Sequence, residues 1–251
     1  MRAIILSAGR GSRLLPLTTD LPKCLLPVGL TSVLGLQLDT LFRGGIEHAT
    51  VVTGFNEHLV RAEIDKRQTG PNVDVLYNPF FQVADNLASC WMVREHMHED
   101  FLIINGDTLF SPDILEKVLN APAKDITVTI DQKNYYDGDD MKVTLAQGQL
   151  LSISKTLAPR ETNGESIGML RFMNDGPQIF RDELDRLMRL EDGTKSWYLS
   201  AIDGLAKSGQ RIDTTNISGS TWAELDTPED YEICRNLFGD SDMARQRLSI
   251  V

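Results

Sequence analysis

Glycine and arginine dominate the segment SAGRGSR, which directly follows a short apolar run at the start of the chain. The apolar run, residues 3–6, has the composition of a buried strand. Gly9 and Gly11 lack the Cβ atoms that would keep a backbone away from a phosphate chain, and the N–H groups of such a loop form a concave nest for anions. Arg13 and Lys23 add full positive charges. The segment therefore predicts a nucleoside triphosphate site.

Two better-known phosphate-binding loops do not fit this segment. The dinucleotide fingerprint G-x-G-x-x-G needs a glycine at position 14, where the chain has Leu14. The P-loop pattern G-x-x-x-x-G-K-[ST] fails because no Gly-Lys pair occurs near the loop. An ordinary surface turn is the alternative for the segment taken alone, since isolated glycine motifs give many false matches.

Charge and composition narrow the class of protein. The 251 residues carry a net charge of −11, which argues against general nucleic-acid binding, yet the first 24 residues hold four basic side chains and one acidic one. Three widely spaced cysteines without a C-x-x-C pair predict neither structural disulfides nor a zinc site, which suits a reducing cytoplasm. The apolar run at the start is too short for an export signal, and no stretch has the length of a membrane span. We expect a cytoplasmic protein with neither nucleic acid nor membrane as partner.

Strand-like and helix-like segments alternate in the first half of the chain. The strands are expected at residues 3–6, 49–52, 73–77, 101–104 and 126–130. The helices are expected at 33–42, after a cap at Asn56, at 87–98 and from Ser111-Pro112. This alternation implies right-handed crossovers and a mainly parallel sheet, whose ligands lie at the carboxyl ends of the strands. The glycine-rich loop and Asp107 both follow such strands, so we expect them to share one site.

The second half of the chain has a different pattern. Met141–Leu145 and Gln149–Ser154 flank a Gln147-Gly148 turn and predict a β-hairpin. Further strands are expected at 166–172, 212–217 and 221–225, and helices at 182–190, at 197–207 and after the N-cap Thr227. We therefore expect an α/β protein of three layers, α/β/α, built on a Rossmann-like, mainly parallel but mixed sheet with an inserted hairpin.

Two aspartates are candidate metal ligands. Asp107 follows the strand at 101–104 and faces the phosphate loop, where Mg²⁺ takes one or two carboxylates together with phosphate oxygens and water. Asp226 occupies a similar junction between a strand and a helix, and Glu224, two residues earlier, would face the same side of that strand. A turn or capping role is the alternative for both aspartates, although Thr227 already supplies a good cap for the second helix.

An aromatic and acidic segment, YYDGDD at residues 135–140, indicates a site for a positively charged group. Aromatic faces beside carboxylates are suited to holding an ammonium group, and Trp197-Tyr198 add two further rings. A solvated acidic loop and core aromatics are the alternative. Lys142 and Lys155 on the predicted hairpin, and Glu165 after it, receive no role from the residues alone because strand lysines are usually solvated.

The segments AIILSAGRGSRL and LPKCLLPV together resemble the N-terminal signature of the nucleotidyltransferase superfamily that activates sugar and alcohol phosphates. NPFFQVADNLASCW, IINGDTLF, ITVTIDQKNYYDGDDMKVTL, SKTL, ESIGMLRF and WAELDTPEDYE look like its cytidylyltransferase branch, which includes the bacterial phosphocholine and the 2-aminoethylphosphonate cytidylyltransferases. The similarity spans residues 1–238. We expect one domain there, with a nucleotide-binding half at 1–131, an acceptor-binding half with the second metal ligand at 132–238, and a C-terminal tail at 239–251.

The resemblance implies a role for each residue that matches a motif. The nucleotide-binding positions are Ser7 (alanine in many members), Ala8, Gly9, Gly11, Ser12, Asn86, Ser89 and Gly106. The Mg²⁺ ligands are Asp107 and Asp226. The cations are Arg13 and Lys23 at the triphosphate and Lys142 and Lys155 around the acceptor phosphate. The acceptor-binding positions are Tyr136, Asp139, Asp140, Glu165, Trp197, Tyr198 and Glu224.

The resemblance further implies a Mg²⁺-dependent reaction between CTP and a small phosphorylated or phosphonylated alcohol or amine. An acceptor oxygen would attack the α-phosphorus of CTP in line, and pyrophosphate would leave. Such an acceptor has a second pKa of about 6, so it is already an anion near neutral pH and needs no general base. A sugar-1-phosphate nucleotidyltransferase using UTP, dTTP or GTP is the alternative, and a nucleotide-binding regulatory protein is a third reading. A homodimer is left open.

Overall fold

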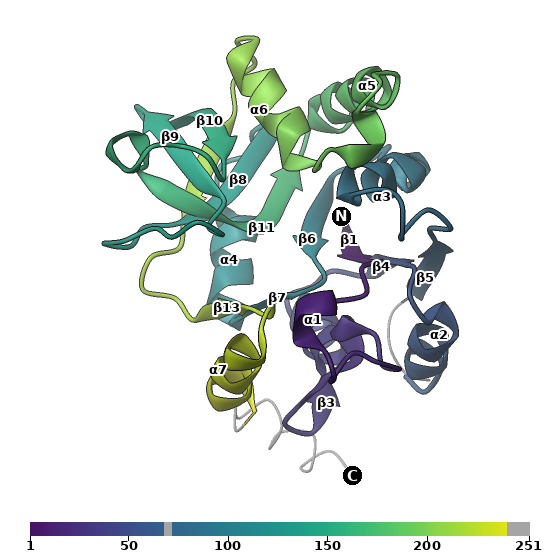
Figure 1. The fold of residues 1–251 in the computed structure, drawn as a ribbon. Helices are drawn as coiled ribbons and strands as arrows, with labels where there is room; N and C mark the ends of the chain where they lie inside the picture. The colour runs from purple at the N-terminus through teal and green to yellow at the C-terminus, as the bar shows by residue number, and fades with distance from the viewer. Residues whose placement is uncertain (68–71, 240–251) are drawn as a thin grey trace.

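A mixed sheet forms the centre of the computed structural model, which describes residues 1–67 and 72–239 (Figure 1). Within this part the main sheet has nine strands in the order β5-β4-β1-β6-β11-β8-β12-β10-β9. Their bounds are Arg2–Ser7 (β1), His48–Thr53 (β4), Asn72–Tyr77 (β5), Phe101–Asn105 (β6), Ile126–Asp131 (β8), Lys142–Ala146 (β9), Gln149–Ser154 (β10), Gly164–Phe172 (β11) and Asp213–Asn216 (β12). Two short sheets pair Pro27–Val28 (β2) with Thr31–Ser32 (β3) and Thr108–Phe110 (β7) with Trp222–Glu224 (β13).

Parallel and antiparallel pairings separate along the sheet. Strands β5, β4, β1 and β6 are all parallel, with Ala3 opposite both Ala49 and Leu102. Strand β11 lies between β6 and β8 and runs antiparallel to both, and the hairpin β9-β10 closes the far end. The mixed α/β sheet and the hairpin are therefore confirmed. The run of four parallel strands is built from the first 105 residues, and β12 also pairs parallel with β8.

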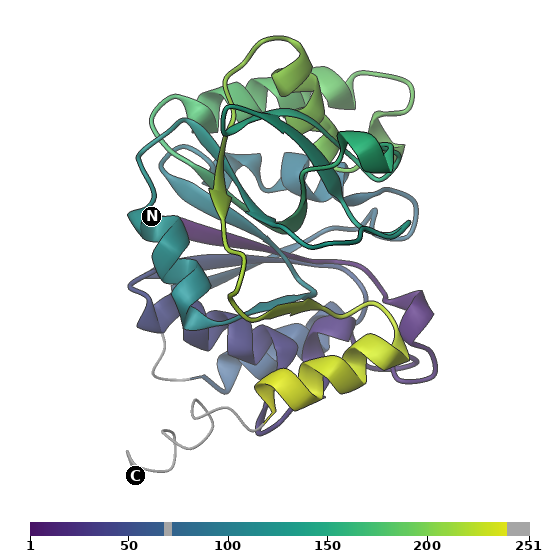
Figure 2. The ribbon, with the colours of Figure 1, turned by 90° about the vertical axis from the view of Figure 1, so that its left-hand side faces the viewer.

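Helices cover both faces of the sheet and give three layers (Figure 2). The helices are Val33–Arg43 (α1), Glu57–Asp65 (α2), Asn86–Met92 (α3), Pro112–Asn120 (α4), Gly176–Met188 (α5), Leu199–Lys207 (α6) and Pro228–Phe238 (α7). On one face α3, α5 and α6 contribute Leu87, Phe180 and Ile202 to a core cluster. On the other, α1 and α4 contribute Leu38 and Ile114. Because the central strands are buried on both sides, their sequences read as continuous apolar runs.

Three local predictions differ from the structure. The helix expected at 87–98 ends at Met92 and continues only as a short 3₁₀ turn, Arg94–His96. The helix expected at 182–190 begins earlier, at Gly176, with a proline in its first turn. Asn56 stands at the start of α2, but its amide donates to the carbonyl of Asp20 and does not cap the helix.

The start of α7 follows the sequence signal closely. The Thr227 side chain accepts a hydrogen bond from the Asp230 N–H, and the Asp230 carboxylate accepts one from the Thr227 N–H. This capping box satisfies two backbone donors at once. It fixes the direction in which the chain leaves β13, and Asp226 lies at that turn. Of the tail expected at 239–251, residues 240–251 lie outside the described residues.

Candidate active site

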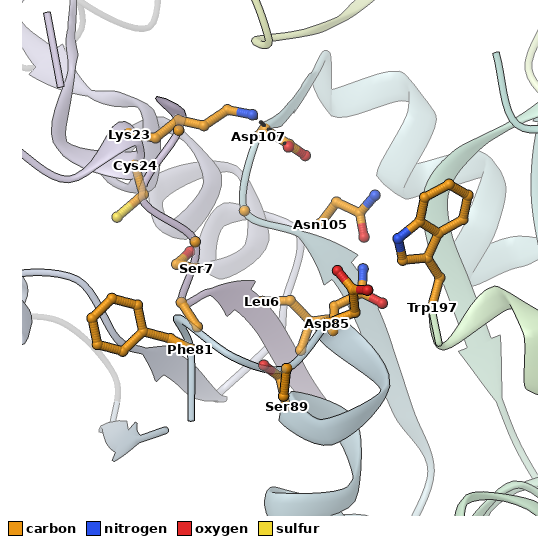
Figure 3. Close-up of a pocket in the computed structure, with 16 residues that line it drawn as sticks. Leu6, Ser7, Lys23, Cys24, Phe81, Asp85, Ser89, Asn105, Asp107 and Trp197 are labelled. Carbon is orange, nitrogen blue, oxygen red and sulfur yellow. Dashed lines mark hydrogen bonds and ion pairs between the residues drawn. The ribbon is translucent and has the colours of Figure 1, made fainter. Parts of the chain in front are cut away.

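The carboxyl ends of β1 and β6 meet at one edge of the sheet, where the sequence analysis expects the site. The two strands are parallel neighbours, with Leu6 opposite Asn105. A pocket of about 280 Å³ lies beyond them (Figure 3). The predicted residues that line it are Ser7, Ala8, Gly9, Gly11, Lys23, Asn86, Ser89, Gly106, Asp107 and Trp197. The structure therefore brings together residues from β1, α3, β6 and the segment before α6.

The two loop glycines meet different needs. Gly11 has a φ of +72°, in the left-handed region that favours glycine, and a Cβ there would lie 3.0 Å from the Cβ of Lys23. An added Cβ at Gly9 would meet no described atom within 4 Å, so this position borders open space. The Thr18 hydroxyl donates to the Gly11 carbonyl at 2.7 Å and holds the turn. Gly11 thus fixes the shape of the loop, whereas Gly9 leaves room beside it.

A lysine and two aspartates, Lys23, Asp107 and Asp226, form what we name the loop cluster. Lys23 Nζ lies 2.7 Å from Asp107 Oδ2 and 2.5 Å from Asp226 Oδ1, and its side chain is only 13% exposed. Strand β13 brings Asp226 there: it pairs antiparallel with β7, and the Leu225 N–H donates to the Asp107 carbonyl. Residues far apart in the chain therefore meet because two short strands, β7 and β13, pair with each other.

The electrostatics of the loop cluster favour the charged forms of Lys23 and Asp226. Burial lowers the pKa of Lys23, but the carboxylates of Asp107 and Asp226 outweigh that effect and raise it overall. Burial likewise raises the pKa of Asp226, but Lys23 and then Arg13 hold it below its ordinary value. Opposite charges this close stabilise each other's charged forms. The Asp226 carboxylate is therefore an anion at neutral pH.

The loop cluster also offers donors for a divalent cation. Asp107 Oδ1 is buried and has no hydrogen-bond partner, so one acceptor of this carboxylate is unused. Within residues 1–67 and 72–239, no group of three or more His, Cys, Asp or Glu side chains is arranged to hold a metal. Two carboxylates without a third ligand fit Mg²⁺, which completes its shell with phosphate oxygens and water.

Glu224 lies beside the loop cluster but differs from it in charge state. Burial raises the pKa of Glu224 to about 8, and the nearby carboxylates of Asp107 and Asp226 add to this shift. The side chain is therefore mostly protonated at neutral pH in the ligand-free protein. In that form Glu224 can donate a hydrogen bond, a property that its predicted place on the same side of the strand as Asp226 does not reveal.

Arg13 connects the loop cluster with the hairpin. Its guanidinium lies 2.8 Å from Asp226 Oδ2 and 3.1 Å from Asp139 Oδ2. The other oxygen of Asp139 lies 3.4 Å from Lys155 Nζ, and this ammonium stands 5.0 Å from the centroid of a Trp197 ring. Two cations therefore converge on a single exposed carboxylate, and one of them also lies beside the Trp197 ring.

Lys142 is buried, which excludes the solvated position usual for a strand lysine. Its side chain is 5% exposed, and Nζ donates to the backbone carbonyl of Lys155 at 2.8 Å. Lys142 therefore holds in place the backbone that carries Lys155.

A second lysine, Lys133, also lies between two carboxylates, those of Asp140 and Glu165. We name these three residues the hairpin cluster; the sequence analysis named the two acids but not the lysine. Lys133 Nζ lies 2.9 Å from Asp140 Oδ1 and 2.9 Å from Glu165 Oε2. Tyr136 accepts a hydrogen bond from the Lys133 N–H through its hydroxyl, and its ring lies 5.8 Å from the same ammonium. The cation expected beside Asp140 and Tyr136 is thus present within the chain. Lys133 lies two residues before the aromatic and acidic segment, which is the one signal for this pairing in the sequence.

Glu165 is the most strongly perturbed member of the hairpin cluster. Its side chain is 3% exposed, and Oε1 is buried without a hydrogen-bond partner. Burial raises the pKa of Glu165 to about 7, with Lys133 opposing the shift and Asp140 adding to it. This carboxyl group titrates near neutral pH and has an unused oxygen.

Tyr198 corrects the set of predicted acceptor residues. Its ring is fully buried in the core cluster of α3, α5 and α6, so no part of it is exposed to a ligand. Its backbone N–H donates a hydrogen bond to Asn86 Oδ1 at 2.8 Å. The side-chain oxygen of Asn86, the residue predicted to recognise the base, is therefore already used within the protein. Trp197, the preceding residue, is exposed and lines the pocket. The chain therefore presents only the first of the two adjacent rings.

Several nucleotide positions have structural duties of their own. A Cβ at Gly106 would collide with the side chain of Ser7 and the carbonyl of Leu6, so this glycine permits β1 and the turn after β6 to lie close together. The Ser89 hydroxyl accepts a hydrogen bond from Asn78 Nδ2 at 3.0 Å. Ser12 does not line the pocket but begins the 3₁₀ turn Ser12–Leu14.

Six residues that line the pocket were not candidates in the sequence analysis: Leu6, Cys24, Phe81, Ala84, Asp85 and Asn105. Figure 3 shows Phe81 and Trp197 on opposite sides of the pocket, with Asp85 between them near Ser89. Asn105 ends β6 and has a buried, unpartnered Oδ1. Its place directly before the Gly106-Asp107 turn was the available signal, since strand ends at this edge face the ligand.

The model of the nucleotidyl transferase family matches residues 2–139. The chain is 27% identical over 92% of its length to the CMP-5'-(3-aminopropyl)phosphonate synthase of Streptomyces rubellomurinus, of which it spans 37%. It is 25% identical to the CTP:phosphoglutamine cytidylyltransferase of Campylobacter jejuni (93% of the chain, 98% of the relative) and 26% identical to the UTP–glucose-1-phosphate uridylyltransferase AglF of Haloferax volcanii (92% and 94%).

Solved structures share the fold. The inositol-1-phosphate CTP transferase of T. maritima aligns with a TM-score of 0.79 at 16% identity, covering 96% of both chains. The CTP:phosphocholine cytidylyltransferase of Streptococcus pneumoniae aligns with a TM-score of 0.77 at 18% identity, covering 94% of this chain and 97% of that one. These likenesses confirm the Rossmann-like α/β architecture. With more than half of its length matched by the family model and the loop at the edge of its sheet, the chain is an enzyme of the nucleotidyl transferase family.

Proposed function

We propose that the protein is a cytidylyltransferase that transfers CMP from CTP to the phosphate or phosphonate of a small alcohol or amine and releases pyrophosphate. The candidate acceptors are 2-aminoethylphosphonate, phosphocholine and their close analogues. The loop cluster at the rim of the pocket carries this proposal, because it joins carboxylates for a divalent ion with a cation for a triphosphate. The names of two relatives and two solved structures support CTP as the nucleotide.

The pocket supports a division of the nucleotide between two walls. The loop of Ala8, Gly9 and Gly11 would lie along the phosphates, where its N–H groups and Arg13 and Lys23 favour anions. Asn86 and Ser89, at the start of α3, would contact the base at the other wall. Each of these two side chains already accepts one hydrogen bond inside the protein, and this bond orients the side chain.

Asp107 and Asp226 would hold Mg²⁺. When bound, the ion neutralises charge on phosphate oxygens and on the leaving pyrophosphate. The pKa of Asp226 below its ordinary value keeps that ligand anionic, and the unpartnered Oδ1 of Asp107 is ready to accept a cation.

The cations around Asp139 would bind the anionic group of the acceptor. Arg13 and Lys155 approach this carboxylate from the loop and from the hairpin, and a phosphonate entering between them would find the same two donors. The acceptor is an anion already at neutral pH, so no general base is required. The protein would act by positioning two mutually repelling anions and screening their charge. Lys142 acts here only through the backbone of Lys155.

The head group of the acceptor would lie near Trp197 and Glu224. An aromatic face and a carboxyl group whose charge depends on its surroundings accommodate either an ammonium or a hydroxyl group. Asp140 and Glu165 are occupied by Lys133, with which both form ion pairs. The chain therefore supports an acceptor with a small polar or cationic head.

A sugar-1-phosphate nucleotidyltransferase is the second candidate. One relative that supports it is the uridylyltransferase AglF, which the chain matches over 94% of that relative's length at nearly the same identity as the cytidylyltransferases. The charges of the loop cluster suit a triphosphate of any base, so only the pocket wall beyond them separates the two functions.

A matrix of nucleotides and acceptors tests the proposal. CTP, UTP, GTP and dTTP are each combined with 2-aminoethylphosphonate, phosphocholine, phosphoethanolamine, a hydroxyalkylphosphonate and two hexose 1-phosphates, with Mg²⁺, and pyrophosphate release is measured. We expect turnover with CTP and an aminoalkyl or hydroxyalkyl acceptor. Turnover with a hexose 1-phosphate and another nucleotide, with CTP inert throughout, would favour the second candidate. The Asp107→Asn variant reports any contaminating activity.

We infer that residues 1–238 work as one domain with a nucleotide half at 1–131 and an acceptor half at 132–238. The proposed metal ligands support this, since Asp107 belongs to the first half and Asp226 to the second. The described helices include none long and apolar enough to cross a membrane. All three cysteines are free and buried, which supports a cytoplasmic location. The homodimer stays a prediction.

A further inference from the structure

The ammonium of Lys23 stands between the two carboxylates that we assign to the metal. Its distances to Asp107 Oδ2 and Asp226 Oδ1 are 2.7 Å and 2.5 Å, within the range of charge-assisted hydrogen bonds. Two partly buried carboxylates this close to one point would repel each other without a cation between them. Lys23 supplies that cation.

The stem of Lys23 also lies against the phosphate-binding loop. A Cβ at Gly11 would be 3.0 Å from Lys23 Cβ and 3.2 Å from Lys23 Cδ, so the side chain runs past the loop on its way to the carboxylates. Rotation about the terminal bonds of a lysine moves its ammonium by several ångströms while the stem stays in place. The ammonium therefore has two sets of partners within reach, namely the carboxylates and an anion on the loop.

Arg13 contacts Asp226 independently of Lys23 and would hold this carboxylate in place if the lysine moved. Its guanidinium lies 2.8 Å from Asp226 Oδ2, the oxygen that Lys23 does not contact. Asp107 Oδ1 has no hydrogen-bond partner, so it is an unused acceptor. When the ammonium moves away, Asp226 would therefore still be held by Arg13, and Asp107 would have both oxygens available for a metal ion.

We propose that Lys23 is a built-in counter-ion that occupies the divalent-metal position in the ligand-free protein and leaves it for the triphosphate when metal and nucleotide bind. This inference rests on the proposed metal role of Asp107 and Asp226. It has a thermodynamic consequence. The metal alone must displace an ammonium that then has no partner, and the nucleotide alone must remove the ammonium from two carboxylates that then repel. Each ligand therefore relieves a cost for the other, and their affinities are coupled in both directions.

The test is a titration of Mn²⁺ into the nucleotide-free protein, with free Mn²⁺ measured by electron paramagnetic resonance. We expect Lys23→Met to bind Mn²⁺ more tightly than the unaltered protein by about tenfold or more, because the competing ammonium is gone. Lys23→Arg keeps a cation at the position and should bind Mn²⁺ as weakly as the unaltered protein. The readout is metal affinity, so it does not depend on turnover.

Two control variants separate local competition from general charge. Lys155→Met removes a nearby cation that contacts Asp139 and neither ligand of the metal, and should tighten Mn²⁺ binding by no more than about twofold. Lys117→Met removes an exposed lysine paired with Asp113 on α4 and should change nothing. Lys23→Gln serves as a second neutral variant, and thermal unfolding with and without Mn²⁺ verifies that each variant is folded. We expect Mn²⁺ to raise the melting temperature of Lys23→Met more than that of the unaltered protein.

The outcomes are distinguishable. Tighter binding in Lys23→Met and Lys23→Gln that is lost when Asp107→Asn is added supports the inference. Equal Mn²⁺ affinity in the unaltered protein and both neutral variants overturns it and leaves the metal site standing. If Asp107→Asn and Asp226→Asn bind Mn²⁺ as well as the unaltered protein, the metal assignment itself is wrong.

Discussion

The loop cluster and the hairpin cluster each place one lysine between two carboxylates, yet Asp226 of the first and Glu165 of the second shift in opposite directions. In the loop cluster the pKa of Asp226 lies below its ordinary value, whereas in the hairpin cluster burial raises the pKa of Glu165 to about 7. A second cation explains the difference: Arg13 also contacts Asp226, whereas Glu165 is more deeply buried and has Asp140 beside it. A lysine between two carboxylates therefore leaves Asp226 ionised in one cluster, whereas Glu165 in the other titrates near neutral pH.

The largest effect is expected from Asp107→Asn, which removes one carboxylate from the loop cluster. Turnover with Mg²⁺ should fall by about 10²–10³-fold, the usual size of losing one electrostatic element of such a site. The fold should persist, because the Leu225 N–H bonds the backbone carbonyl of Asp107 and not its side chain. Steady-state pyrophosphate release and circular dichroism check the two statements. Asp192→Asn, at an exposed site, is the matched control, and normal turnover in Asp107→Asn would remove this residue from the reaction.

Lys155→Met should have the next largest effect, confined to the acceptor. Loss of a charge-assisted contact to the acceptor anion is expected to raise KM for the acceptor by about 10–30-fold. KM for CTP should change little, since Lys155 contacts Asp139 and Trp197 and not the loop. Initial rates at varied acceptor and fixed CTP give the numbers. An equal rise in both KM values would mean that Lys155 serves the nucleotide as well.

The comparison of the clusters becomes sharpest in the pH dependence of stability. Because the folded-state pKa of Glu165 is raised to about 7, the folded protein binds the extra proton and stability falls as pH rises from about 4.5 to about 7. Glu165→Gln removes that loss, so relative to the unaltered protein it should gain about 1–2 kcal/mol between pH 5 and pH 8. Urea unfolding at the two pH values measures the gain.

Asp226→Asn should show the opposite sign. The folded-state pKa of Asp226 is lowered, so its contribution to stability is present above the ordinary aspartate pKa and is lost as pH falls below it. The variant should therefore be less stable than the unaltered protein at pH 7 and approach it at low pH. Parallel pH profiles for Asp226→Asn and Glu165→Gln would refute the contrast between the two clusters.

The smallest effect is expected from Asp139→Asn. Its side chain is 70% exposed, and exposed ion pairs contribute little to stability. The acceptor KM should change by no more than about threefold, because Arg13 and Lys155 remain in place and lose only an exposed partner. Asp140→Asn, which breaks a more buried pair with Lys133, should weaken acceptor binding more. Reversal of that order would show that Asp139 itself contacts the acceptor.

The sequence predicted those parts of the site that depend on local order. The apolar run before Gly9 and the strand before Asp107 identified two strand ends, and parallel strands bring their ends to one edge. Asp226 was accessible in the same way, through the strand and helix signals on either side of it. The hairpin cluster was not, because Glu165 meets Lys133 only through the antiparallel register that sets Glu165 opposite Asp131.

Burial of single aromatic rings was equally beyond the sequence. Trp197 and Tyr198 are adjacent, and the start of α6 turns one toward the pocket and the other into the core. The end of α3 at Met92 carries no glycine or proline signal, so the helical pattern appeared to continue to residue 98. In each case contacts with distant elements decide the outcome, and local patterns do not contain them.

The crowded glycines divide the pocket into a part that can be redesigned and a part that cannot. Any side chain at Gly11 would press on Lys23, and one at Gly106 would strike Ser7, so these two positions of the phosphate half tolerate no added atoms. The opposite wall is made of side chains, among them Phe81, whose shape varies freely with residue type. A library that seeks a new base preference should therefore randomise that wall and leave the loop untouched.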